Sequence, residues 1–126
     1  MVMTDSRNEL DGAAAPIDFD ELLGRCVGRQ DFVDKVIDNF ATYLPKQLEQ
    51  MTQAAAQPDN AKLRTLAHQL KGGSLTVSAH RLGKLAHRLE TTAEEGSSID
   101  VANCLNELRA EADRLTAAVR ARLKKE

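Results

Sequence analysis

The chain has 126 residues and a mass of 13.8 kDa, enough for one domain. Hydrophobic residues make up 42% and charged residues 29%, as in ordinary soluble globular proteins. Aromatic residues make up only 3%, and the apolar residues are mostly Leu and Ala, which are strong helix formers. This composition predicts an all-helical fold and argues against a β-sandwich or barrel. The length excludes a kinase with its own nucleotide-binding domain.

The chain is close to neutral, with 17 Lys and Arg against 19 Asp and Glu, and a pI near 5.9. It lacks the basic footprint of a nucleic-acid-binding protein. No apolar run is long enough to span a membrane, and the N-terminus does not resemble a secretory signal, so we expect a cytoplasmic protein. Cys26 and Cys104 lack the spacing of a metal site and are predicted to be reduced thiols.

The first half of the chain predicts a tail and two helices. Residues 1–16 are small and polar and are expected to form a flexible tail. A short helix is predicted over residues 17–26. From Asp31 to Met51, apolar residues recur every three or four positions, and this period continues across Pro45. That continuity favours one kinked helix over two separate helices. Phe32 and Phe40 share its spacing and are expected in the core.

The second half predicts three more helices. Pro58 and Asp59 mark a new start, followed by a period from Leu63 to Val77. Ser78 is expected to cap a fourth helix, which ends before Gly96. The last helix runs from about Val101 to Leu123. The sequence therefore predicts an all-α, up-down four-helix bundle over residues 17–126, with a short additional N-terminal helix.

One histidine in the third helix lies away from the predicted core. At about 100° per residue, His68 lies roughly 140° from Leu63, whereas the other apolar positions cluster near Leu63. Arg64, Lys71, Gly72 and Leu75 lie on the same outer side. The pair Gly72-Gly73 costs helix stability, roughly 1 kcal/mol per residue relative to Ala. Such a defect indicates a surface that another molecule approaches closely.

These residue types suit reversible phosphoryl transfer. An imidazole is substantially neutral and nucleophilic near pH 7. Lys71 can balance the charge of a phosphoryl group, and Arg64 adds a more diffuse positive field. Gly72 leaves room for a partner that carries the rest of the chemistry.

The segment Ala67-His68-Gln69-Leu70-Lys71-Gly72-Gly73-Ser74 resembles the histidine-containing phosphotransfer (HPt) domain of bacterial two-component phosphorelays. Residues that follow or precede it fit the same pattern, namely Ala79, Leu82, Leu85, Leu89-Glu90, Ile17-Asp18, Leu22-Leu23, Phe32, Phe40, Pro45 and Leu48. The resemblance covers about residues 17–95. It departs from the family at Ser78, where Gly is usual, and at Gly73, where Ser or Ala is commoner.

The resemblance implies that His68 accepts a phosphoryl group from the receiver domain of a hybrid sensor histidine kinase and passes it to the receiver domain of a response regulator. Lys71 and Gly72 are then its supporting pair, and Arg64, Gln69, Gly73 and Leu75 are candidate partner-binding residues. The chain would be a monomeric phosphocarrier without kinase activity, metal or cofactor. We expect no nucleic-acid or membrane partner.

Two other functions are open to a helical bundle of this kind. The same bundle could dock on a receiver or a kinase without carrying phosphate. It could also be the dimerisation bundle of a sensor kinase, but an acidic residue is expected after the histidine there, and Gln69 follows His68. His80 and His87 are interpreted as ordinary surface histidines, because neither is followed by Lys-Gly and their spacing does not suit a metal.

Overall fold

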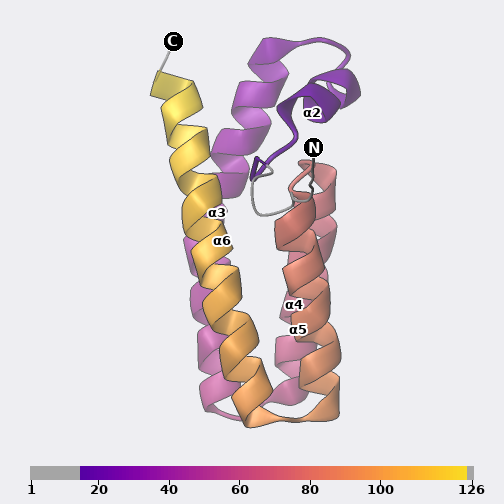
Figure 1. The fold of residues 1–126 in the computed structure, drawn as a ribbon, viewed down its shortest axis with the longest axis vertical. Coiled ribbons are helices and arrows are strands. Elements are labelled where there is room, and N and C mark those ends of the chain that lie inside the picture. The colour runs from indigo at the N-terminus through magenta and orange to yellow at the C-terminus, as the bar shows by residue number, and fades with distance from the viewer. Residues whose placement is uncertain (1–14, 125–126) are drawn as a thin grey trace, which may run out of the picture.

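The computed structural model describes residues 15–124, which form five helices and no strand (Figure 1). The helices are α2 (Phe19–Arg25), α3 (Gln30–Ala56), α4 (Asn60–Thr76), α5 (His80–Glu95) and α6 (Ser98–Lys124). The predicted all-α bundle with a short N-terminal helix is confirmed. Of the expected tail, residues 1–14 lie outside the described residues, and Pro16 is buried.

The four long helices form an up-down bundle. Each consecutive pair is joined by only two or three residues, at positions 57–59, 77–79 and 96–97, so neighbours run antiparallel. Helix α3 contacts α4 and α6, and α5 contacts α4 and α6. Helices α3 and α5 therefore lie on one diagonal of the bundle and α4 and α6 on the other.

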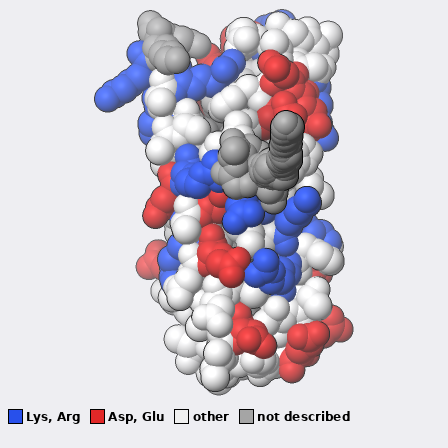
Figure 2. All heavy atoms as spheres, in the orientation of Figure 1, with Lys and Arg blue, Asp and Glu red and all other residues white. Residues whose placement is uncertain are grey.

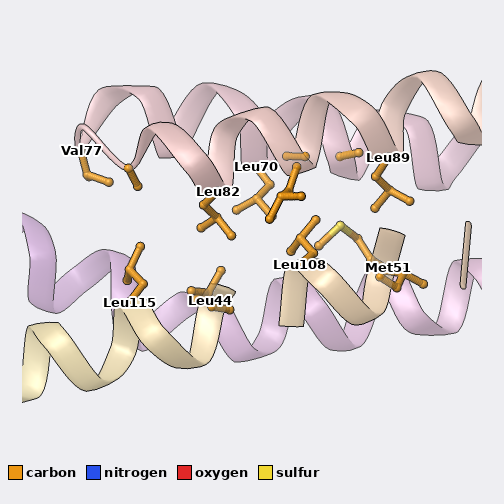
Figure 3. Packing of buried hydrophobic residues seen from close by; sticks show 14 of the residues in the cluster. Leu44, Met51, Leu70, Val77, Leu82, Leu89, Leu108 and Leu115 are labelled. Carbon is orange, nitrogen blue, oxygen red and sulfur yellow. The ribbon is translucent and has the colours of Figure 1, made fainter. Parts of the chain in front are cut away.

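The core lies along the bundle axis and is built almost entirely of aliphatic side chains. Each long helix contributes a stripe of buried residues at intervals of three and four. Figure 3 shows side chains of all four helices pointing toward one another, among them Leu44, Met51, Leu70, Leu82, Leu89, Leu108 and Leu115. Burying one such side chain stabilises the fold by about 1.5–3 kcal/mol.

Helix α3 confirms one prediction and corrects another. It continues through Pro45 as a single helix, as the apolar period indicates. Phe32, however, is 46% exposed and is not a core residue, whereas Phe40 is half-buried against the core. Phe32 stands one residue before the buried Val33, about 100° round the helix. The guanidinium of Arg29 covers its ring at 4.0 Å from the centroid.

Helix α2 packs where α3 and α6 extend beyond the α4–α5 turn (Figure 1). Helices α3 and α6 have 27 residues each, against 17 and 16 for α4 and α5, so they are longer by about 15 Å. Ile17 and Leu22 are buried at this end. The amide of Asp18 donates a hydrogen bond to the carbonyl of Ser78 at 2.9 Å, which ties the start of α2 to the α4–α5 turn.

The α4–α5 turn overturns the expected role of Ser78. Its φ of +60° places it in the left-handed region, where glycine is favoured. The amide of Ala79 donates to the Ser74 carbonyl at 2.8 Å, and the amide of Ser78 donates to the Leu75 carbonyl at 3.1 Å. These bonds form a Schellman motif, so Ser78 ends α4. The N-cap of α5 is Ala79, which has no capping side chain.

The surface carries charges of both signs, which are interspersed on the face seen in Figure 2. Of the C-terminal basic residues, Arg120 pairs with Asp38 at 2.7 Å and Arg122 lies 3.6 Å from Asp34. The expectation that Cys26 and Cys104 are unpaired thiols is confirmed. Within residues 15–124, no helix combines the length and the apolar character needed to cross a membrane.

Candidate functional site

Helix α4 presents His68 to solvent. Its buried side consists of Leu63, Ala67, Leu70 and Ser74, which are spaced by three and four residues. His68 follows Ala67 and turns away from the bundle axis, so its side chain is 65% exposed. The helical-wheel prediction for this residue is confirmed.

Glu90 of α5 holds the ring of His68. Its Oε2 lies 3.1 Å from His68 Nδ1, and its side chain is only 23% exposed. A carboxylate accepts hydrogen bonds, so this contact favours a proton on Nδ1. In the neutral ring, Nε2 then carries the lone pair and is available as a nucleophile. Glu90 is one of the residues that carry the family resemblance, but the sequence alone did not place it at the site.

Lys71 lies on the same seam between α4 and α5. Its Nζ is 3.6 Å from Glu90 Oε1 and 3.4 Å from His87 Nδ1, and the side chain is 28% exposed. His68 and Lys71 thus contact the two oxygens of one carboxylate. This places a cation beside the imidazole of His68, on one helical face. His87, interpreted from the sequence as an ordinary surface residue, is part of this cluster.

The two glycines that follow Lys71 have different surroundings. A Cβ added to Gly72 would meet nothing within 4 Å, so this position leaves open space on the outer surface. A Cβ on Gly73 would lie 3.5 Å from Cε1 of Phe40, an ordinary packing distance. Gly72 therefore leaves the helix surface next to His68 free of a side chain, and Gly73 lies against α3.

The remaining predicted partner-binding residues surround His68 along α4. Arg64 is exposed and lies 3.8 Å from Glu94 of α5, and Gln69 is exposed. Leu75 is 43% exposed. The other side of Leu75 packs on α5, where a Cβ on Gly83 would come within 3.2 Å of its Cδ2. Arg25 of α2 donates to the Leu75 carbonyl at 3.0 Å.

A groove runs between α3 and α4 beside this face. Its volume is about 420 Å³, and it is lined by Val36, Asn39, Phe40, Tyr43, Gln47, Gly73, Thr76 and Val77. Tyr43 is 64% exposed. Tyr43 lines the groove, and Phe32 and Leu75 are further exposed apolar side chains of α3 and α4. Sequence periodicity does not reveal the groove, because it arises from the packing of two helices.

A cluster with potential metal ligands lies elsewhere, where α2 and α5 begin. Ligand atoms of Asp18, Glu21 and His80 lie within 4.8 Å of one another. They already bond within the protein: His80 Nε2 lies 2.8 Å from Glu21 Oε1, and Asp18 Oδ1 accepts from the Glu21 amide at 3.0 Å. The Ser78 hydroxyl, followed by the His80 ring, lowers the pKa of Glu21.

An antiparallel helical bundle that carries an exposed histidine, a neighbouring lysine and a glycine on one helix face defines the class of histidine phosphotransfer modules. The chain belongs to the Hpt domain family, because the model of that family matches residues 35–118. Among solved structures, it is similar to the HPT domain of the Hpt sensor hybrid histidine kinase from Shewanella. The two share 19% identity with a TM-score of 0.76, over 89% of this chain and 97% of the other. No curated protein was found to match the chain.

Proposed function

We propose that the chain is a phosphorelay intermediate. His68 accepts a phosphoryl group from the receiver-domain aspartate of a hybrid sensor histidine kinase and passes it to the receiver-domain aspartate of a response regulator. The observation that carries this proposal is an exposed imidazole whose Nδ1 is held by Glu90 at 3.1 Å in a chain of the Hpt family.

The chemistry follows from the tautomer that Glu90 favours. The lone pair on His68 Nε2 attacks the phosphorus of the aspartyl phosphate, an N–P bond forms, and the O–P bond of the acyl phosphate breaks. The aspartate leaves as a carboxylate. The proton on Nδ1 stays in its hydrogen bond to Glu90, which stabilises the positive charge that the ring gains. Attack of a second receiver's aspartate on the phosphorus reverses these steps.

The chain supplies position and charge for this transfer. Lys71 provides a positive charge beside the phosphoryl group, and Gly72 allows the receiver to approach Nε2 closely. The divalent cation that supports such transfers would belong to the receiver. The chain is therefore a phosphocarrier that needs no cofactor of its own and does not use ATP.

The receiver would dock on the face that carries His68 and the adjoining groove between α3 and α4. Leu75 and Tyr43 offer exposed apolar surface there, Gly73 lines the groove, and Arg64 and Gln69 lie on the His68 helix. A small interface of this kind suits a transient complex. We propose a monomeric protein that acts in the cytoplasm.

The direct test is to incubate the protein with a receiver domain carrying radiolabelled aspartyl phosphate. We expect acid-labile, base-stable label on the wild type and on His80→Gln, the matched control, and none on His68→Gln. Labelled ATP alone should label none of them. Transfer to His68→Gln would contradict the assignment of the acceptor. A wild type that binds the receiver without taking label would instead support a docking module.

A further inference from the structure

A second histidine lies against Lys71. His87 projects from α5 one turn before Glu90, and its Nδ1 is 3.4 Å from Lys71 Nζ and 3.8 Å from Glu90 Oε1. The ring is 62% exposed. Its Nδ1 therefore meets a cation and a carboxylate on the seam that also holds His68.

The two contacts of His87 require different protonation states. An ammonium group has three donors and no acceptor, so Lys71 bonds to Nδ1 only when that nitrogen carries a lone pair. This is the neutral ring with its proton on Nε2. A protonated ring would point an N–H at the Lys71 ammonium and repel it, and would bond to Glu90 instead.

We propose that His87 is a positioning residue for Lys71: its neutral ring accepts a hydrogen bond from the ammonium and, with Glu90, fixes the charge of Lys71 beside His68. This role rests on the proposed phosphotransfer function. When His87 becomes protonated, Lys71 loses one of its two contacts. The protonated ring of His87 also competes with the ring of His68 for the carboxylate of Glu90. Both changes should slow transfer.

The other charged groups around His87 contact residues other than His87 or lie in another part of the surface. On α5, Arg88 reaches toward α6 and bonds to Glu107 at 3.0 Å, and Lys84 lines a hollow beside the start of α2. Across the seam on α4, His68 contacts Glu90, and Arg64 lies nearest Glu94. Lys71 and Glu90 are therefore the charged groups that His87 contacts.

The experiment compares two substitutions that differ in one acceptor atom. The side-chain oxygen of His87→Asn can occupy the place of Nδ1, whereas His87→Ala removes it. We expect His87→Ala to slow transfer from a phosphorylated receiver about fivefold, the factor that one hydrogen bond of average strength supplies. His87→Asn should stay close to the wild-type rate near neutral pH. In a Lys71→Ala background, His87→Ala should have no further effect.

A pH profile separates this role from a merely structural one. Both proteins retain His68, so the comparison of their rates reports the effect of the side chain at position 87. As the pH falls from about 8 to about 5.5, where imidazoles titrate, the wild-type rate should drop below that of His87→Asn. A constant ratio of the two rates would overturn the proposal, and so would a wild-type rate for His87→Ala.

Nitrogen chemical shifts of the His87 ring provide a readout without phosphate. A free neutral imidazole already favours the proton on Nε2, so in the unphosphorylated protein near pH 8 we expect a smaller Nδ1–H population in the wild type than in Lys71→Ala. A proton on Nδ1 in the wild type would overturn the proposed contact. If the ring shows the expected tautomer but the wild type takes no label, the phosphotransfer function fails, and the positioning role falls with it.

Discussion

At the scale of single residues, the site depends on one carboxylate that two helices share. Glu90 contacts His68 with one oxygen and lies near Lys71 and His87 with the other. The imidazole of His68 and the ammonium of Lys71 are therefore oriented from α5 although both belong to α4. In the proposed transfer, the ring of His68 is therefore oriented before the receiver binds.

Replacing Glu90 by Gln tests this orientation. Gln keeps the size of the side chain but loses the charge that favours a proton on His68 Nδ1. We expect transfer to His68 to slow about fivefold, as for loss of a partly exposed hydrogen bond. Ring nitrogen shifts should show a smaller Nδ1–H population. Glu94→Gln, one turn further along α5, is the matched control, and an equal slowing in both variants would contradict the role of Glu90.

A substitution at Gly72 should change stability and phosphoryl transfer in opposite directions. A side chain there would enter open space, so Gly72→Gln should raise the free energy of unfolding by about 0.5–1 kcal/mol through helix propensity. The same side chain should obstruct a receiver and slow transfer. Denaturant unfolding and transfer rates measured on one preparation check both effects. A variant that is more stable and transfers at full rate would show that the clearance is not needed.

The sequence predicted the residues of α4 at this site but not those of α5. His68, Lys71 and Gly72 lie within five positions of one helix, where the helical period alone places them on one face. Glu90 and His87 reach the site only through the packing of α5 on α4. The period of α5 separates its buried from its exposed side, but it does not tell which exposed residues face α4.

At the scale of helices, two turns between helices place a residue other than glycine in the left-handed conformation, which is unfavourable for such residues. Ser78 follows α4 with a φ of +60°, and Val27 follows α2 with a φ of +56°. At both helix ends the backbone hydrogen bonds are those of a Schellman motif, which usually contains Gly. The expected Ser cap of α5 was wrong for this reason: the left-handed conformation that ends α4 falls on the same residue.

Val27 offers the cleaner test of this strain, because its side chain is 86% exposed. The left-handed conformation costs a non-glycine residue about 1–2 kcal/mol. Val27→Gly removes that cost, and we expect a rise of about 1 kcal/mol in the free energy of unfolding, measured with denaturant. Val27→Ala keeps the unfavourable φ and should gain less. Equal stability of the two variants would argue against strain at this position.

The attachment of α2 should depend on pH through Glu21. Ser78 and His80 lower the pKa of this carboxyl below its usual value of 4.5. A depressed pKa in the folded state means that the stabilisation is present above 4.5 and is lost as the pH falls through the folded-state pKa. Glu21→Gln should therefore be less stable than the wild type at neutral pH. The difference should disappear under acid conditions, and thermal unfolding at several pH values measures it.

At the scale of the whole molecule, the apolar periods were sufficient to predict four long helices and their order. They predicted a short helix that covers one end of the bundle, but not which end, nor that α3 and α6 extend beyond the other pair there. Those features depend on where each helix ends. The end of α4 is hard to predict because Ser78 stands where a helix end usually has Gly. Phe32 was misplaced for a related reason, since a residue at the edge of a stripe is buried only if another element covers it.

The confinement of the site to α4 and α5 has a consequence for folding. His68 and Glu90 are only 22 residues apart in the chain, and the contacts that join them span a single helical hairpin. Contacts of short sequence separation form with a small loss of chain entropy. We therefore expect the site to assemble early in refolding and to persist when the ends of the longer helices open. Pulse-labelled amide exchange should show the amides near His68 and Glu90 protected no later than those near Val119 in α6.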